Sequence, residues 1–404
     1  MPWRRLRNPR FLLRALRRLA IRPQWRTALF TALALAAVWT PLGQAGALND
    51  FRDSHLLHSY EEAAARTVTE YGQLPLWTPW SCGGLFAWGN PQTRQASPTL
   101  LLSALFGARR AEPMVLMLFL LLGMEGAFRY ARLKAGNAVG ALLVAPLFGL
   151  CGFGAQSWSL GWLYLLGFLL LPWVLWGTAL AGRGRAKGAA AVALGFALML
   201  GFGGTYPVPL AALFVAVEGG WALIAGAGPL RRRALALATT AALTLAACVF
   251  RLWPIWETLQ SGPRVMAGNP GHSLQKVAGM LFSFPATGDK GGHGGLFFVG
   301  PGLVLLALPA LLGRRSRFPV ALTVLCGWLA TGYAAHPAPF AWLRALPIFE
   351  TLRYPERFLF PCALFLAVTG AIGVGVLQVW LRRPRSPALT RWAPELLGAV
   401  VLLC

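Results

Sequence analysis

The chain has 404 residues, of which 56% are apolar and only 12% are charged. Soluble domains are usually about 45–50% apolar and about 25% charged, so this composition excludes an ordinary soluble globular protein. The net charge of +24 would suit nucleic-acid binding, but the distribution of the basic residues indicates a different cause.

The lysines and arginines gather between apolar blocks. Nine of the 37 lie in the first 26 residues, and a tight set follows every second apolar block. These sets are Arg129, Arg132 and Lys134; Arg183, Arg185 and Lys187; Arg231 to Arg233; Arg314, Arg315 and Arg317; and Arg382, Arg383, Arg385 and Arg391. This is the positive-inside pattern of a multi-pass membrane protein. The pattern therefore explains the net positive charge by membrane topology rather than by nucleic-acid binding. It also predicts a cytoplasmic N-terminus.

Apolar blocks long enough to cross a bilayer as a helix, which takes about 20 residues, recur along the chain. We therefore predict an all-α polytopic membrane protein with ten or eleven transmembrane helices. Ten predicted spans are 27–46, 112–131, 137–156, 159–181, 188–204, 208–227, 234–251, 296–313, 318–335 and 358–380. An eleventh begins near Arg391 and stops at Cys404 before it is long enough to cross, which predicts that this sequence is a fragment of a longer protein.

Residues 1–26 are predicted to form a basic cytoplasmic segment lying on the membrane, followed by one polytopic domain over 27–404. The apolar stretch 99–107 is too short to cross and is predicted to be re-entrant or interfacial. Long outer loops are predicted at about 47–98, 252–295 and 336–357. All five histidines and all three aspartates fall in these loops. Chemistry is therefore expected at the outer boundary of the membrane.

The first outer loop carries the acids best suited to catalysis. Asp50 and Asp53 follow the first span directly, and two acids three residues apart can share one face of a helical turn. Such a pair suits a general base, or two ligands of a divalent cation such as Mg²⁺ or Mn²⁺. The alternative is that both are ordinary loop acids. A short helix is predicted over 55–71, followed by a loop over 75–98 that lies on the membrane.

The third outer loop contains Glu350, Arg353, Glu356 and Arg357 just before a span. Arginines at the outer edge oppose the positive-inside rule, so they need another explanation. One is phosphate binding, for which the guanidinium fork is well shaped, and the other is a local network of arginine and glutamate. The second outer loop, which includes His293, is rich in glycine and is expected to order over a bound substrate.

Two glutamates, Glu125 and Glu218, lie within predicted spans near the cytoplasmic end, where ionisable residues are rare. We expect each to reach water or to pair with a nearby arginine. Charges near the bilayer midplane are otherwise almost absent. A transporter or lipid flippase of the cell envelope is therefore the less favoured class, because such proteins usually place polar groups at the midplane.

Six segments share a pattern of proline, glycine and aromatic residues. They are GQLPLWTPWSCGG (72–84), GNPQTRQASP (89–98), GGTYPVP (203–209), FSFPATG (282–288), GLFFVGPGLVLLALPALLGRR (295–315) and LPIFETLRYPERF (346–358). In this order they resemble YfhO-type bacterial membrane proteins, which are similar to the GT-C class of integral-membrane glycosyltransferases. The resemblance covers most of the chain.

The resemblance implies a GT-C-like architecture in which long outer loops carry short interfacial helices. It also implies transfer of a sugar from a polyprenyl-phosphate donor to a glycan, lipid or protein acceptor outside the cytoplasm of a bacterium. The base would be Asp53 or Asp50, and Arg353 with Arg357 would hold the donor phosphate. Further residues expected near the substrate are His55, Glu62, Arg66, Asn90, Gln92, Tyr206 and His293. An assembly protein without activity is a third alternative.

Overall fold

A computed structural model describes residues 9–43, 52–80, 83–261, 269–283, 297–346, 348–350 and 352–382. Within these ranges the chain is helical, and extended segments pair only at two isolated bridges. The longer helices are α2 (Pro9–Ile21), α3 (Pro23–Gly43), α4 (Arg52–Tyr71), α6 (Ala108–Ala135), α7 (Ala138–Gly149), α9 (Leu171–Ala181), α10 (Ala186–Gly201), α11 (Pro207–Ala225), α12 (Leu230–Ser261), α15 (Arg317–Ala330) and α17 (Leu359–Arg382). Shorter helices are η1 (Ala87–Gly89), α5 (Leu100–Phe106), α8 (Gly152–Ser159), η2 (Leu163–Leu170), α13 (Leu274–Phe282), α14 (Pro301–Ala307), η4 (Leu308–Leu312), η5 (Arg314–Ser316), α16 (Pro339–Arg344) and η6 (Pro355–Phe358).

Each of the ten predicted spans up to residue 380 contains a helix of the described structure. Among the described residues, seven stretches are long and apolar enough to cross a membrane: Pro23–Gly43, Ala108–Ala135, Ala138–Ser159, Leu163–Ala181, Pro207–Ala225, Leu230–Gln260 and Pro355–Trp380. The other three predicted spans are shorter helices, at Ala186–Gly201, Pro301–Leu312 and Arg317–Ala330. At about 1.5 Å per residue these three fall short of a hydrocarbon core of roughly 30 Å. The multi-pass all-α prediction is confirmed, and the span predicted from Arg391 lies outside the described residues.

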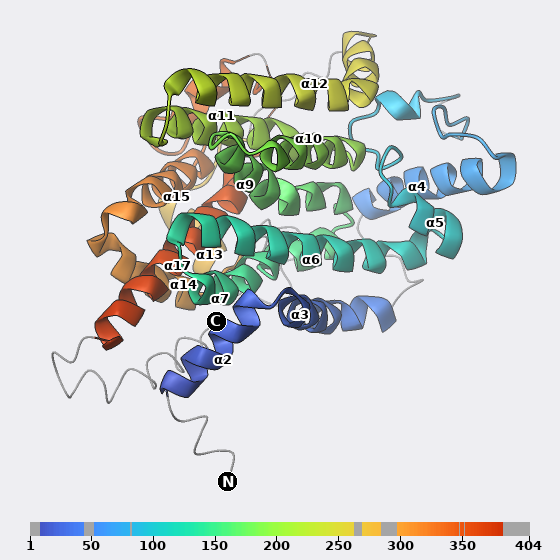
Figure 1. Cartoon of the computed structure of the whole chain (residues 1–404). Helices are drawn as coiled ribbons and strands as arrows, with labels where there is room; N and C mark the ends of the chain where they lie inside the picture. Colours follow the sequence, from blue (N-terminus) through green and yellow to red (C-terminus); the bar gives the residue numbers. More distant parts are fainter. Residues whose placement is uncertain are drawn as a thin grey trace.

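The centre of the bundle is formed by α6 with α7, α9 and α17, each of which packs on α6, and α17 also packs on α7. In the apolar stretch that contains α17, 83% of the residues are buried, against 17% in the stretch of α12. α17 is therefore an inner helix, and α12 lies at the periphery with α10 and α11 alongside it at the top of Figure 1. Glycine permits the closest contact at the centre, since a Cβ at Gly140 of α7 would lie 2.4 Å from the carbonyl oxygen of Ala371 in α17.

One end of the bundle, which we call the basic end, carries Lys134, Arg183, Arg233 and Arg315, one residue from each of four described basic sets. Glu125 of α6 accepts hydrogen bonds of 2.8 and 2.9 Å from Arg26 and one of 2.7 Å from Arg129. The predicted pairing with arginine is thus confirmed for Glu125. Glu218 of α11 instead pairs with Lys134, because the end of α6 brings that lysine beside it.

The opposite end, which we call the loop end, carries α4 and α5, and these two helices lie together at the right of Figure 1. α4 confirms the helix predicted over 55–71 and begins slightly earlier, at Arg52. α5 confirms that the apolar stretch 99–107 does not cross as a helix of its own, because it has only 7 residues. The tryptophans of the following loop include Trp77 and Trp80, which are 54% and 50% exposed, as expected at a membrane interface.

Candidate active site

The predicted base, Asp53, lies in the first turn of α4 at the loop end. Its side chain is exposed, and Oδ2 accepts a hydrogen bond of 3.0 Å from Nε1 of Trp162. The same turn of α4 rests on Gly161, where an added Cβ would lie 2.5 Å from the Cα of Ser54. Gly161 and Trp162 together therefore fix where α4 begins, and with it the carboxylate of Asp53.

Arg357 lies in η6, directly before α17. Its side chain is only 5% exposed, and its Cζ lies 3.6 Å from the ring centroid of Tyr206. The rings of Tyr354 and Trp162 lie farther away, at 5.0 and 5.9 Å. Nη1 of Arg357 has no hydrogen-bond partner among the described residues. A buried guanidinium held by aromatic rings, with an unused N–H donor, is suited to bind an anion.

Trp162 contacts both the acid and the cation. Its N–H donates a hydrogen bond to Asp53, and its ring lies within cation–π distance of Arg357. Tyr206 completes the arrangement beneath Arg357. Burial raises the pKa of the Tyr206 phenol, and the nearby Arg357 opposes this shift only in part. The Tyr206 hydroxyl therefore stays protonated at neutral pH and can donate a hydrogen bond to a substrate.

Arg353, the second arginine predicted to bind phosphate, lies beside this group. Its Cζ is 5.2 Å from the ring centroid of Tyr354, and its side chain is partly buried. Its carbonyl oxygen accepts a hydrogen bond of 3.1 Å from the N–H of Asn269, and its backbone also contacts the Tyr206 hydroxyl. The structure thus places Arg357 with Asp53, whereas Arg353 supports the aromatic rings around them.

Three predicted substrate residues lie on α4. His55 is exposed, two residues after Asp53 in the first turn, and side chains at this spacing do not face each other. Glu62 and Arg66 form an exposed ion pair with each other, with Nε of Arg66 3.0 Å from Oε1 of Glu62. Glu62 is about 13 Å along the helix from Asp53. The structure therefore places neither the His55 side chain nor the Glu62–Arg66 pair on the face of α4 that carries the Asp53 carboxylate.

Arg251 of α12 anchors the first-loop segment that contains Asn90 and Gln92. Its Nη2 donates to the carbonyl oxygens of Asn90 and Thr93, at 2.8 and 3.1 Å, and to the Thr93 hydroxyl at 2.9 Å. The Asn90 side chain in turn accepts a 3.0 Å hydrogen bond from the N–H of Gln92. Arg251 is fully buried, and sequence reasoning missed it. The available signal was a single arginine near the end of an apolar run, where charge is rare.

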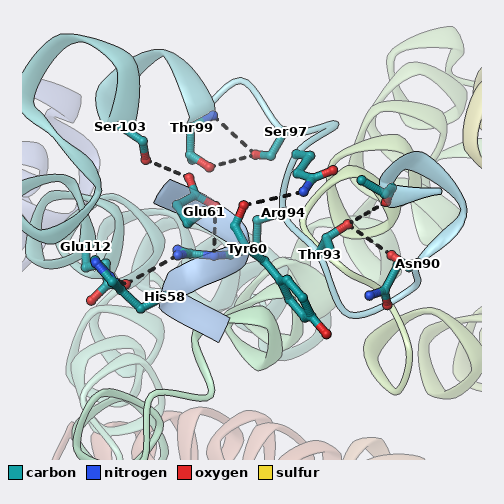
Figure 2. Close-up of polar contacts among 12 residues, drawn as sticks. His58, Tyr60, Glu61, Asn90, Thr93, Arg94, Ser97, Thr99, Ser103 and Glu112 are labelled. Carbon is teal, nitrogen blue, oxygen red and sulfur yellow. Dashed lines mark hydrogen bonds and ion pairs between the residues drawn. The ribbon is translucent and has the colours of Figure 1, made fainter. Parts of the chain in front are cut away.

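A second ionic group, shown in Figure 2, ties α4 to the first loop, α5 and α6. Arg94 lies between two carboxylates, with Nε 3.5 Å from Glu61 of α4 and Nη2 3.6 Å from Glu112 of α6. His58 is 3.2 Å from Glu112, and the Ser103 hydroxyl donates to Glu61 at 2.6 Å. We call these five residues the α4 clasp. Sequence reasoning placed Glu61 on a helix but did not find its partners.

The described residues contain no group of three His, Cys, Asp or Glu side chains that could hold a metal ion. The described partner of Asp53 is Trp162, whose N–H is not a metal ligand. Asp50 and His293 lie outside the described residues, so the pairing of Asp50 with Asp53 around a divalent cation stays a prediction.

No protein-family profile and no curated protein sequence matches the chain. Among solved structures, the fold is similar to the arabinofuranosyltransferase AftD from mycobacteria, with a TM-score of 0.57 and 17% identity over 95% of this chain and 26% of AftD. It also aligns with ArnT from Cupriavidus metallidurans bound to undecaprenyl phosphate (TM-score 0.47, 17% identity, 93% of this chain, 63% of ArnT). A third alignment is with the oligosaccharyltransferase AglB from Archaeoglobus fulgidus, in complex with an inhibitory peptide and a dolichol-phosphate (TM-score 0.49, 13% identity, 93% of this chain, 54% of AglB).

The chain therefore spans 26% of AftD and less than two thirds of ArnT and AglB. The likeness confirms the predicted GT-C-like architecture of a multi-pass membrane protein. The narrower resemblance to YfhO-type proteins stays a prediction.

Proposed function

We propose that the chain is a membrane glycosyltransferase that moves a sugar from a polyprenyl-phosphate donor to an acceptor hydroxyl at the loop end. The proposal is carried by one observation: an exposed carboxylate, Asp53, and a buried guanidinium, Arg357, meet the same side chain, Trp162. The GT-C-like fold, shared with an arabinofuranosyltransferase, supports the class. The positive-inside pattern supports a cytoplasmic basic end, so the reaction would occur on the outer face of a bacterial inner membrane.

Asp53 would act as the general base. It takes the proton of the acceptor hydroxyl while the acceptor oxygen forms a bond to the anomeric carbon of the sugar. The bond from that carbon to the donor phosphate oxygen breaks, and its electron pair stays on the oxygen, which releases polyprenyl phosphate. A phosphate can leave without being protonated, so the second carboxylate of a glycosidase is not needed. Because Asp53 is exposed, its proton can return to water.

Arg357 would hold the donor phosphate. Its unused Nη1 can donate to a phosphate oxygen, and the aromatic rings keep the guanidinium plane in place. Negative charge grows on the phosphate as the glycosidic bond breaks, so this contact becomes stronger in the transition state than in the bound donor. The lipid tail of the donor could remain in the bilayer beside the bundle.

The test is transfer of labelled sugar from pentosyl and hexosyl polyprenyl phosphates by the purified chain in vesicles. A general base contributes about 10²- to 10⁴-fold, so Asp53→Asn is expected to lower kcat at least about 100-fold with little change in donor KM. Asparagine can still accept the Trp162 hydrogen bond, so the fold should be kept.

The matched control is Glu70→Gln, which removes an exposed acid from the far end of the same helix. This control is expected to keep full activity. A folded wild-type chain that transfers no sugar from any of these donors would contradict the proposed function. Full activity in a folded Asp53→Asn variant would contradict the assignment of the base.

A further inference from the structure

We infer that Arg94 is a positioning residue, which holds α4 through Glu61 so that Asp53 faces Trp162. The inference rests on the proposed function, because it assigns Asp53 the role of the base. It concerns a residue of the α4 clasp, whose described side-chain contacts are to Glu61, Glu112 and the ring of Phe202 rather than to Asp53 or Arg357.

Arg94 joins two helices with one side chain. It is 6% exposed, and its guanidinium lies between Glu61 of α4 and Glu112 of α6, at 3.5 and 3.6 Å (Figure 2). A buried guanidinium between two carboxylates resists displacement, because any slide of α4 would leave a buried charge without its partner. The planar fork also fixes the direction of both contacts, which a lysine cannot do. Arg94 therefore sets the place of α4 against α6.

The loop around Arg94 is itself held firmly. Thr93 accepts hydrogen bonds from Arg251 of α12. The side-chain amide nitrogen Nε2 of Gln95 donates a hydrogen bond of 3.4 Å to the carbonyl oxygen of Tyr60. This segment thus connects a peripheral helix of the bundle to α4. The segment that carries Arg94 is therefore held in place by hydrogen bonds on both sides of it.

The position of Asp53 depends on this support because α4 lies at the edge of the bundle. Asp53 is in the first turn, and Glu61 follows eight residues later, about 12 Å along the helix. A helix of this length moves as a rigid rod, so a shift or rotation at Glu61 reaches Asp53. The contact between Gly161 and Ser54 limits one direction of this movement, and the α4 clasp limits the others.

The inference predicts an effect on kcat and not on donor binding. Arg357 comes from η6, a different segment from the α4 clasp, so the donor phosphate should be held as before. A misplacement of about 1 Å at a reacting group can cost about 100-fold in rate. Arg94→Gln is therefore expected to lower kcat about 10- to 100-fold and to change donor KM less than about 2-fold. Arg94→Lys, which keeps the charge, should recover part of the loss.

The matched control is Arg110→Gln, which removes an exposed arginine from the first turn of α6. It takes away the same charge at the same end of the bundle and should leave kcat unchanged. The deciding measurement is a double-mutant cycle with Asp53→Asn. If Arg94 acts through Asp53, Arg94→Gln causes no further loss of kcat in that background. An equal loss in both backgrounds would overturn the inference.

A measurement without substrate separates this inference from the proposed function. Hydrogen–deuterium exchange of residues 52–71 is compared among wild type, Arg94→Gln, Arg94→Lys and Arg110→Gln. Faster exchange at the start of α4 is expected in Arg94→Gln, less in Arg94→Lys and none in Arg110→Gln. If the wild-type chain transfers no sugar, the proposed function is contradicted. Hydrogen–deuterium exchange would still show whether Arg94 of the α4 clasp holds the start of α4. Unchanged exchange in Arg94→Gln would overturn the inference even in an active enzyme.

Discussion

Replacing Gly161 by alanine is expected to push the first turn of α4 away from Trp162. The added Cβ would lie 2.3 Å from the Cβ and 2.5 Å from the Cα of Ser54. Carbon atoms in contact normally stay about 3.5–4.0 Å apart, so the two segments must separate by about 1 Å or more. Gly161 also has a φ of +69°, and this left-handed conformation costs alanine about 1–2 kcal/mol.

The two effects can be separated with a second glycine. Gly72, at the other end of α4, has a φ of +61°, and no atom lies within 4 Å of its added Cβ. Gly72→Ala therefore carries a similar backbone penalty without the clash. A displacement of about 1 Å can lower a rate about 100-fold, so Gly161→Ala should lose about that factor in kcat while Gly72→Ala stays near wild type.

The assay is sugar transfer at saturating donor, with thermal melting of each variant in the same detergent. Both variants are expected to melt at a lower temperature than wild type, because both place alanine at positive φ. Equal kcat values in the two variants would refute the reasoning. They would show that the contact between Gly161 and Ser54 does not set the position of Asp53.

Three further changes test other parts of the structure. Arg357→Lys removes the planar stack on the aromatic rings, a loss of about 2 kcal/mol, and should raise donor KM about 30-fold in initial-rate measurements. Arg251→Met leaves the Thr93 carbonyl without its described donor, at about 1–3 kcal/mol, and should speed deuterium exchange over residues 87–97. Gly140→Val overpacks the contact of α7 with α17, and should lower the free energy of unfolding by about 1–3 kcal/mol, measured by denaturation.

Most of the helices could be predicted from the sequence, because a membrane span must be apolar and must satisfy its own backbone hydrogen bonds. For the same reason, the helix over 186–201 overlaps the predicted span 188–204. The predicted span ended at residue 204, three residues after the helix ends. Apolar residues and glycines occur both in a span and in the turn that follows it, so the sequence does not mark where the helix stops. The helix predicted over 55–71 was close to α4, because its polar residues alternate with apolar ones at helical spacing.

The candidate site could be predicted only in part. Arg357 stood out because arginines at the outer edge oppose the positive-inside rule, and Asp53 because it follows the first span directly. Trp162 could not be found in this way, since a tryptophan near the end of a span reads as an interfacial residue. Arg251 was equally hidden, because an arginine near the end of a span usually extends to water. The partners of Arg94 lie on α4 and α6, which are distant from each other in the sequence. No local sequence pattern predicts that these helices bring their glutamates to the same arginine.

The burial of Arg357 against aromatic rings has a consequence for the surroundings in which the protein can work. Charges exposed to water lose their attraction over about 8 Å at physiological ionic strength, whereas buried charges are screened much less. Arg357 is 5% exposed, so an anion held against it would be attracted almost equally in dilute and in salty solution. A site built in this way keeps its hold on an anion when the ionic strength around the protein changes.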